Sequence, residues 1–395
     1  MLEQVISNKA GWTRVAFGDV VRKVNDKTDP WKSGLERYVA GDHMVTDDLQ
    51  IRRWGTIGDD YLGPAFHMRF KPGHVLYGSR RTYLRKVALA DFEGITANTT
   101  YVLDSKDPLV LMPELLPFIM QTEAFHANSI ARSKGSVNPY VNFSDLACFE
   151  FSLPPIQEQA RLVDVMKAVE VVSEGHIKTQ TALRTLLASL IDSTAAKGLK
   201  AGSAVPLEKL VHENRPICYG ILMPGTGHYG GVPVIKVRDY PDGEIIEEGL
   251  LLTSPELDEE YQRSRLQSGD LIISIRGTVG RLAVVPESLD KANITQDTAR
   301  LSLKLELNPD FIRAMLESTY VQRQIASFIV GLAVKGINIG ELRRIIIPVV
   351  SRTEQDDLVR EISEIRARQI SLNERVVMNS SLKKLLLERN FGLSS

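Results

Sequence analysis

Two stretches of the chain carry apolar residues at helical spacing along a narrow seam. In the first stretch the apolar positions follow at intervals of 4, 3, 14, 4 and 3 residues, at Leu162, Met166, Val169, Leu183, Leu187 and Leu190. In the second the intervals are 4, 3, 7 and 4, at Leu358, Ile362, Ile365, Leu372 and Val376. Such intervals place apolar side chains on one face of a helix. The pattern predicts one long helix over residues 153–197 and another after residue 347.

Local signals mark the ends of these helices. Leu153-Pro154-Pro155 precedes the first, and proline fits the first turn of a helix. We expect Gly198 to end the first helix and Gly392 to end the second, because glycine adopts the backbone conformation that follows a helix C-terminus. His176 lies in the gap of 14 residues. It is either a functional histidine or a polar residue that fixes the register of a coiled coil.

Each seam is narrow and the rest of each helix has mixed charge, so each helix needs a partner. Pairing of the two helices with each other, in an antiparallel sense, is the economical solution. A helix of about 40 residues is on the order of 60 Å long at 1.5 Å per residue. The pair would then be a rigid spacer between two globular domains.

The second half of the chain repeats the first. Glu158-Gln159, followed by Leu162-Val163, returns as Glu354-Gln355 with Leu358-Val359, a shift of 196 residues (354 − 158). The same shift carries one set of residues onto another, namely Gly73, Arg80, Thr82 and Arg85 onto Gly269, Arg276, Thr278 and Arg281. A period this large predicts two copies of a whole domain together with its connector.

The rest of each copy has diverged. Residues 203–260 share almost nothing with residues 14–66. One interpretation is that a single scaffold recognises two different targets. The other is neutral drift after duplication.

The predicted fold class is α+β. Strand-like runs with Gly, Pro and Asp between them occur in both copies, at 75–77, 99–103 and 271–275. We expect two globular mixed α/β domains separated by two long antiparallel coiled-coil helices, related as a pseudo-two-fold internal repeat. The predicted segments are residues 1–152, 153–200, 201–347 and 348–395.

Bulk composition narrows the class of protein. Apolar content of 43% and charged content of 25% are ordinary for a globular protein. The chain has no apolar run of the ~18–20 residues that span a bilayer and no basic-then-apolar leader, so we expect a cytoplasmic protein without a membrane partner. Two cysteines, Cys148 and Cys218, fit a reducing compartment and are expected to be buried. The net charge of −1 means that any DNA-binding charge must be concentrated on one face.

Patterns that resemble catalytic motifs lack the neighbouring residues or elements that such motifs need. Residues 225–230 match Gly-x-Gly-x-x-Gly, but no strand precedes them and no helical pattern follows, which favours a loop. Asn138-Pro139-Tyr140 lacks one proline of the amino-methyltransferase motif, and no glycine-rich methyl-donor loop accompanies it. The histidines show no metal-ligand spacing. We expect no catalytic residue, no cofactor and no metal in this chain.

Four segments together resemble the specificity subunits of type I restriction-modification systems. These segments are LPPIQEQARLV (153–163), IPVVSRTEQDDLV (347–359), SGDLIISIRGTVG (268–280) with NITQDT (293–298), and KPGHVLYGSRRTYLR (71–85) with ITANTT (95–100). They resemble the target recognition domains and the conserved helical regions of that family. The resemblance covers residues 11–392 and includes the order of the four segments.

The resemblance implies a non-catalytic DNA reader. Each target recognition domain of such a subunit reads one half of a split, asymmetric site in double-stranded DNA. The long helices set the distance between the halves and dock two methyltransferase subunits, which bind S-adenosylmethionine and methylate adenine. Two restriction subunits, which use ATP and Mg²⁺, complete the assembly.

Candidate DNA-binding residues are those whose groups pair with base edges or phosphates. In the first copy they are Arg80, Arg81, Thr82, Tyr83, Arg85, Lys134, Ser136, Asn138 and Tyr140. In the second copy they are Arg276, Thr278 and Arg281, with Lys335 and Asn338 from a Lys-Gly loop that we take as equivalent to Lys134-Gly135. Weaker candidates are His228, Tyr229, Lys236 and Arg238.

The roles of several candidates stay open. Arg80 and Arg276 occur in both copies, so they serve the phosphate backbone, base identity or the shared fold. The first copy has Arg81 and Tyr83 where the second has Gly277 and Val279. These differences are either added base contacts or a different turn with surface side chains. Two other functions compete with DNA reading: a stand-alone modification enzyme, and an adaptor that holds partner proteins through its coiled coil.

Overall fold

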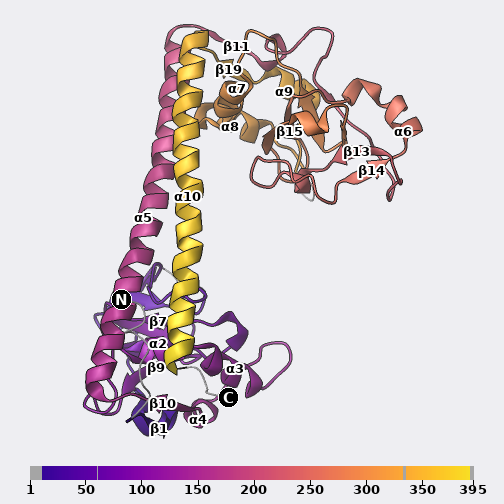
Figure 1. The fold of residues 1–395 in the computed structure, drawn as a ribbon. Helices are drawn as coiled ribbons and strands as arrows, with labels where there is room; N and C mark the ends of the chain where they lie inside the picture. The colour runs from indigo at the N-terminus through magenta and orange to yellow at the C-terminus, as the bar shows by residue number, and fades with distance from the viewer. Residues whose placement is uncertain (1–10, 60, 332–334, 392–395) are drawn as a thin grey trace. The chain divides into compact units, whose positions relative to one another are not determined.

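The two expected long helices are present. The computed structural model describes residues 11–59, 61–331 and 335–391. Helix α5 spans Ile156–Lys200 and helix α10 spans Arg352–Phe391 (Figure 1). Along the predicted seams, Leu162, Met166 and Val169 are buried, as are Leu358, Ile362, Ile365 and Leu372. Within the described residues, no helix is both long and apolar enough to cross a membrane.

The prediction that Gly198 ends the first helix is wrong. Helix α5 continues to Lys200, and the glycine with positive φ that follows its end is Gly202, at +67°. A Cβ atom at Gly198 would lie 3.0 Å from the carbonyl oxygen of Val349. Gly198 therefore allows a neighbouring strand end to approach the helix closely. Gly392, expected to end the second helix, lies outside the described residues.

The chain forms two compact units. Unit 1 comprises residues 1–177 and 373–395, and unit 2 comprises residues 178–372. Each unit contains one end of α5 and one end of α10, so each includes a globular part and a segment of both helices.

The described residues of unit 1 form three sheets. Strand β1 (Thr13–Ala16) pairs with β10 (Glu150–Leu153) in an antiparallel ladder. The second sheet has the order β2-β9-β6-β7, with bounds Val21–Lys23, Thr100–Ser105, Val75–Gly78 and Val87–Leu89. The third has the order β4-β3-β8-β5, with bounds Gly55–Thr56, Arg37–Val39, Gly94–Ala97 and Phe66–Phe70.

The central strand of unit 1 is buried on both faces. Val75 and Tyr77 of β6 join one apolar cluster, while Leu76 joins another, as the alternation of side chains along a strand requires. The first cluster includes Leu387 and Phe391 of α10. The short helical elements of this unit are α1 (Phe17–Val20), η2 (Thr82–Leu84), α2 (Leu116–Met120), α3 (Glu123–Ala131) and α4 (Phe143–Ala147).

The sheets of unit 2 follow the strand orders of unit 1, except that the third sheet has three strands among the described residues where that of unit 1 has four. Strand β11 (Ala204–Pro206) pairs with β19 (Ile346–Pro348). The second sheet has the order β12-β18-β15-β16, with bounds Cys218–Tyr219, Thr298–Leu301, Leu271–Ser274 and Leu282–Val284. The third has the order β14-β13-β17, with bounds Leu251–Thr253, Val232–Ile235 and Asn293–Ile294.

The core of unit 2 follows the same plan. Leu271 and Ile273 of β15 join one cluster and Ile272 joins the other. The helical elements are η3 (Leu207–Lys209), η4 (Val237–Asp239), α6 (Pro255–Glu260), η5 (Gln262–Ser264), η6 (Glu287–Leu289), α7 (Pro309–Glu317), α8 (Thr319–Phe328) and α9 (Ile339–Arg344). In both units the third sheet has one parallel pair, β3 with β8 and β13 with β17.

Within each unit the ends of α5 and α10 contact each other. In unit 1 the Asn379 amide donates to the Val169 carbonyl at 3.3 Å and to the Ser173 hydroxyl at 2.7 Å, and Lys383 pairs with Glu170 at 2.6 Å. Ser173, further along α5, contacts Asn379, whereas the earlier Glu170 contacts the later Lys383. The two helices are therefore antiparallel in this unit.

In unit 2 an ion pair joins the two helices. Lys197 of α5 pairs with Glu354 at the start of α10, and together with hydrogen bonds from Ser351 it lowers the pKa of Glu354 to about 2. Ile191 and Ala195 of α5 share one apolar cluster with Leu358.

A buried glutamine fixes the start of each long helix. The side-chain Oε1 of Gln159 accepts from the Met112 amide at 2.9 Å, and its Nε2 donates to the backbone carbonyls of Val110 and Pro154. Gln355 repeats the arrangement in unit 2, accepting from the Asn308 amide at 3.0 Å and donating to Val350. Both side chains are almost fully buried. The repeated Glu-Gln pair therefore has a structural purpose, since its glutamine satisfies backbone groups of the globular part from the first turn of the helix.

One prediction for the cysteines is wrong. Cys148 is exposed and Cys218 is half-buried. Cys148 directly follows the short helix α4, where its Sγ donates to the carbonyl of Ser144 at 3.3 Å.

Gln159→Ala should destabilise unit 1 by about 2–4 kcal/mol, because it leaves buried backbone donors and acceptors without partners. The matched control is Gln157→Ala, an exposed glutamine two residues earlier on the same helix, expected to change stability by less than about 0.5 kcal/mol. Urea denaturation of the full-length protein followed by circular dichroism measures both. Equal effects of the two substitutions would contradict this role of Gln159.

Candidate nucleic-acid interface

In unit 1 the two predicted recognition segments lie against each other. Strand β6 ends at Gly78, and the chain turns through the next eight residues before β7. The Arg81 amide donates to the Pro139 carbonyl at 2.6 Å, and the Val141 amide donates to the Ser79 carbonyl at 3.0 Å. Segments that are about sixty residues apart in sequence are thus joined by backbone hydrogen bonds at the end of the central strand.

The second of these segments is a closed loop. Lys134 and Tyr140 exchange backbone hydrogen bonds of 2.7 and 2.9 Å, which bring the two ends of the loop together. Gly135 has a φ of +90°, a conformation that side-chain-bearing residues rarely adopt. Ser136 and Asn138 between the ends are exposed.

Side chains from both segments also contact each other. The Arg81 Nε donates to the Asn138 Oδ1 at 2.9 Å. The Arg80 guanidinium carbon lies 5.8 Å from the centroid of the Tyr140 ring. Lys134 Nζ lies 3.0 Å from Asp145, and this hydrogen bond lowers the pKa of Asp145. We name the exposed set of side chains here the unit 1 cluster: Arg80, Arg81, Tyr83, Lys134, Ser136, Asn138 and Tyr140.

Two predicted DNA-binding residues of this turn, Thr82 and Arg85, are not part of the unit 1 cluster. Thr82 is only 2% exposed, so its hydroxyl does not reach the surface. Arg85 donates to Asp47 at 2.9 Å and to both carboxylate oxygens of Glu123 at 2.8 and 2.9 Å. Burial opposes the charge of Arg85, but these two carboxylates outweigh it and raise its pKa. Arg85 as placed here supports the fold of unit 1.

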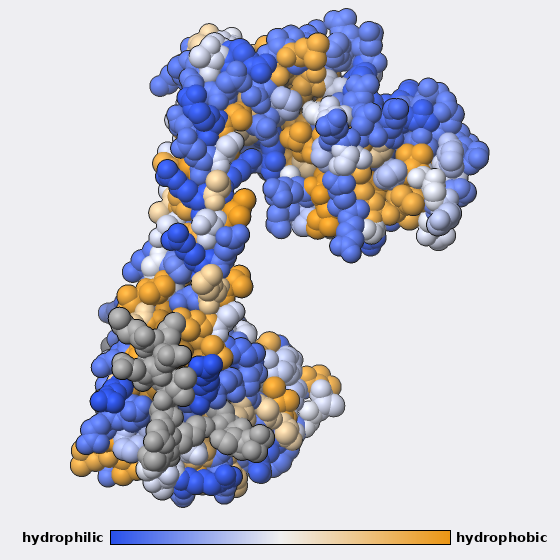
Figure 2. Space-filling view, in the orientation of Figure 1, coloured by the Kyte–Doolittle hydropathy of each residue, from blue (hydrophilic) through white to orange (hydrophobic). Residues whose placement is uncertain are grey.

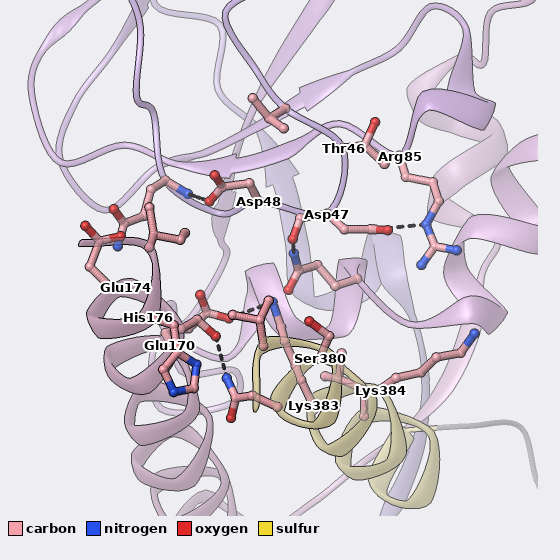
Figure 3. A pocket seen from close by; sticks show the side chains of 18 of the residues that line it. Thr46, Asp47, Asp48, Arg85, Glu170, Glu174, His176, Ser380, Lys383 and Lys384 are labelled. Atoms are coloured by element: carbon pink, nitrogen blue, oxygen red, sulfur yellow. Dashed lines mark hydrogen bonds and ion pairs between the residues drawn. The ribbon is translucent and has the colours of Figure 1, made fainter. Parts of the chain in front are cut away.

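Arg85 points into a pocket of about 520 Å³ in unit 1 (Figure 3). Side chains from the 46–48 segment and from both long helices line the same pocket, including Lys384, which pairs with Glu123 at 3.1 Å. His176 is another lining residue, and its buried Nδ1 has no hydrogen-bond partner among the described residues. A register-fixing role for His176 stays a prediction.

Unit 2 has a corresponding site at the end of its central strand. The Gly277 amide donates to the Lys335 carbonyl at 2.9 Å, and the Ile337 amide donates to the Ile275 carbonyl at 2.9 Å. The exposed Arg276 donates from Nη1 to the Gln296 Oε1 at 3.0 Å. Lys335 is also exposed. As in unit 1, the arginine that follows the strand is packed on a second segment of chain.

The other predicted DNA-binding residues of unit 2 are Thr278, Arg281 and Asn338, and they differ in exposure and in hydrogen-bond partners. Thr278 is exposed, whereas Arg281 is half-buried and directs Nη1 toward the Val237 carbonyl at 3.4 Å. Asn338 is the N-terminal cap of α9, where its Oδ1 accepts from the Glu341 amide at 2.8 Å. Its side-chain oxygen therefore has a structural partner.

The loop that ends at Gly336 corresponds to the loop that ends at Tyr140, as expected, but the two Lys-Gly dipeptides do not correspond within it. Bridges join Arg80 to Tyr140 in unit 1 and Arg276 to Gly336 in unit 2, so Gly336 corresponds to Tyr140. The shift is again 196 residues (336 − 140), and it makes Val330 the counterpart of Lys134. The shared Lys-Gly dipeptide is a coincidence of sequence, because turn residues recur in any loop of this kind.

The turn after the central strand differs between units. Arg81 has a left-handed backbone with φ of +50°, where unit 2 has Gly277 at +73°. A side-chain-bearing residue in this conformation costs about 1 kcal/mol or more. Unit 1 also forms the 3₁₀ turn η2 over Thr82–Leu84. The turn is thus different, and it holds an arginine at a position where glycine is the easier residue.

The weaker candidates occupy a separate loop and its surroundings. His228 and Tyr229 are exposed, and the irregular loop 225–230 contains three glycines with positive φ. No strand or helix covers residues 225–230, which agrees with the loop expected there. Lys236 is half-buried and Arg238 is exposed.

Chemically, both sites offer hydrogen-bond donors at the surface. Guanidinium groups bind phosphate oxygens and guanine edges, and amide side chains match adenine edges. Sequence reasoning missed Gln296, which contacts Arg276; its segment, residues 293–298, was noted without assigning it a role. Among described residues, no group of three or more His, Cys, Asp or Glu side chains is arranged to hold a metal ion.

Comparison with known proteins gives a consistent result. The family of type I restriction modification DNA specificity domains matches residues 9–180. The specificity subunit of the type I restriction enzyme EcoBI of Escherichia coli is 30% identical over 180 residues, which cover 45% of this chain and 37% of that protein. The EcoDI specificity subunit of Escherichia coli is 27% identical over 153 residues, covering 38% and 33%. These matches therefore span about a third of the length of each relative.

Solved structures share the fold over almost the whole chain. A chain from a structure on the complex assembly and conformational transition of a type I system matches with a TM-score of 0.62 and 19% identity, covering 96% of this chain and 97% of that one. The type I restriction-modification S subunit of M. genitalium matches with a TM-score of 0.57 and 14% identity, covering 99% and 98%. At these identities the likeness concerns the fold.

Two arginines with left-handed backbone give a stability test of the unit 1 turn. Arg81→Gly should change the free energy of unfolding by less than about 1 kcal/mol, because relief of the backbone conformation offsets the lost hydrogen bond. Arg85→Gly should be more destabilising by about 1–2 kcal/mol, since it removes two carboxylate partners. Urea titration of both variants measures the difference. Similar losses for both would show that Arg81 also supports the fold.

Proposed function

We propose that this chain, a type I restriction-modification specificity subunit, reads a bipartite DNA target with its two units. Each unit would recognise one half of an asymmetric site. The observation that carries the proposal is the pair of exposed arginines, Arg80 and Arg276, at the same point of two matching sheets. Each is packed on a second loop that presents different side chains.

The differences between the units support two different half-sites. The unit 1 cluster presents Arg81, Asn138 and Tyr140 beside its arginine, whereas unit 2 has glycine at the positions matching Arg81 and Tyr140. Base identity is read by side chains that reach base edges, while phosphate contacts fix position. A shared arginine with variable neighbours suits a common backbone contact combined with separate base contacts. This pattern favours recognition over neutral drift.

The long helices suit the role of a spacer. Helix α5 has 45 residues, which corresponds to about 68 Å at 1.5 Å per residue. A continuous helix has a fixed length, so two readers attached to it would face the same side of a duplex only at a set number of base pairs. The residues of this chain would thereby set the length of the unread spacer in the target.

Exposed apolar side chains support docking of partner subunits on the helices. In unit 1, Val171 of α5 is 72% exposed, and Val377 and Met378 of α10 are 66% and 70% exposed. Figure 2 shows hydrophobic surface along this helical part of unit 1. Apolar side chains on a surface that is otherwise charged mark sites of protein association. We propose that methyltransferase subunits bind there, two to each chain.

The catalytic groups belong to these partners in our proposal. The methyltransferase subunits would hold S-adenosylmethionine, and two restriction subunits would hold ATP and Mg²⁺. Membership of the specificity family implies a non-catalytic chain. This chain would supply only the recognition of DNA and the geometry of the assembly, in the cytoplasm.

Mapping of methylated adenines tests the proposal. A host that expresses the cognate methyltransferase subunit, with or without this chain, is sequenced by a method that detects the modified base directly. We expect a split motif that is methylated only when this chain is present. Methylation that does not depend on the chain, with the methyltransferase shown to bind it, would contradict DNA reading and favour the adaptor function.

A further inference from the structure

Unit 2 contains a second pocket, separate from the arginine turn, with an unusual share of cations. Its volume is about 940 Å³, and it lies beside the edge strand β12 and the start of η5. Six basic side chains line it: Arg215, Arg263, Arg265, Lys291, Arg300 and Arg343. No local sequence pattern indicates this grouping, because the six residues are spread over about 130 positions.

One of the six, Arg300 of β18, is buried and incompletely bonded. Its side chain is only 3% exposed. It donates to the backbone carbonyls of Pro216, Arg263 and Arg265, but its Nε has no partner among the described residues. No carboxylate in the described chain pairs with it. A buried cation without a counter-charge is costly, so a site of this kind favours an anion.

The fold does not require an arginine at this position. In β18 Arg300 pairs with Ile272, and in the matching sheet of unit 1 Val102 pairs with Leu76. Val102 is fully buried in an apolar cluster there. The same strand position is thus filled by valine in one unit and by arginine in the other. A buried arginine at this strand position is therefore found in unit 2 and not in unit 1.

The cations converge on one place. The thiol of Cys218 is half-buried; burial raises its pKa, while the charges of Arg300, Arg263 and Arg215 act in the opposite direction. Three guanidinium groups from separate segments therefore lie close enough to act on one side chain.

Two of the six cations are already neutralised. Arg215 forms a bidentate pair with Asp270 at 3.0 and 2.9 Å, and Arg265 pairs with Asp258 and Glu259. The other four, Arg263, Lys291, Arg300 and Arg343, form no ion pair within the described residues. Arg343 donates to the Ile217 carbonyl at 3.0 Å, which holds α9 against the pocket. The single acidic side chain in the lining is Asp290, so positive charge is in excess.

We propose that this pocket of unit 2 is a phosphate-binding site built on Arg300, with Arg263 and Arg343 as further donors. Guanidinium groups match the oxygens of a phosphate and remain charged at all physiological pH values. The phosphate belongs either to the DNA backbone or to a free phosphate-bearing molecule. The second source is independent of the proposed function, whereas the first rests on it.

A purely structural role for Arg300 makes a different prediction. In that case Arg300 serves only to satisfy three carbonyl groups, and the rest of the pocket has no ligand. Replacement of Arg300 would then unfold unit 2 without affecting any anion. The informative variants therefore replace cations whose loss should leave unit 2 folded. Arg263→Ala changes an exposed residue, and Arg343→Ala removes only one hydrogen bond to the backbone.

Inorganic phosphate is the first probe. The melting temperature of the full-length protein is measured against phosphate concentration, with sodium chloride adjusting every sample to one ionic strength. We expect a saturable rise of roughly 2–5 °C at about tenfold excess over the dissociation constant. The double variant Arg263→Ala, Arg343→Ala should bind phosphate at least about tenfold more weakly. Arg344→Ala is the matched control, since Arg344 is the exposed neighbour on α9 outside the pocket, and it should bind like the unchanged protein.

The inference is overturned if the unchanged protein shows no saturable response beyond that of chloride, or if the double variant keeps the same dissociation constant. Either result leaves the proposed DNA function untouched. A phosphate response that the double variant loses and Arg344→Ala retains supports the site.

DNA binding by the same double variant, measured at several salt concentrations in the complex with methyltransferase, then identifies the source. A uniform loss of affinity with a salt slope reduced by about 1 assigns the phosphate to the DNA backbone. Unchanged DNA affinity assigns it to a free phosphate-bearing molecule. Both results support the site.

Discussion

The arrangement of each unit depends on one buried amide. Gln159 and Gln355 lie in the first turn of α5 and α10 and bond backbone groups of the loop that precedes α2 in unit 1 and α7 in unit 2. Hydrogen bonds of a buried side chain with several backbone groups fix both position and rotation. The globular part is thereby attached to the helix at a defined angle. A recognition surface on that part has a defined position only because this attachment is rigid.

The same scaffold supports two different surfaces. In each unit the central strand is buried on both faces, whereas the turn that follows the strand is exposed. Alternate side chains of β6 and β15 join separate apolar clusters, which leaves little freedom for substitution. The turn that follows lies at the surface, where side chains are free to differ. Arg81 occupies a left-handed position that glycine fills in unit 2, and Tyr140 corresponds to Gly336. Variation therefore concentrates where a ligand would bind.

Periodicity predicted the long helices and the order of the segments, since apolar spacing and a repeat of 196 residues are direct properties of the sequence. It failed at Gly198, because a glycine inside a helix that permits close packing cannot be distinguished from one that ends it. The two Lys-Gly dipeptides were matched wrongly within corresponding loops, because a shared dipeptide is weaker evidence than a shared register. The sequence named Arg85 as a DNA-binding candidate, but it could not reveal the partners Asp47 and Glu123, which come from distant segments. The pocket around Arg300 depends on contacts across six separate positions, which no local pattern contains.

The central claim is that each unit reads its own half of the target. The most direct test is methylation mapping with two double variants, Arg81→Gly with Asn138→Ala in unit 1, and Gln296→Ala with Lys335→Ala in unit 2. The account predicts that the first relaxes base preference in one half of the motif only, and that the second relaxes it in the other half only. Relaxation of the same half by both variants, or of both halves by either one, would contradict it.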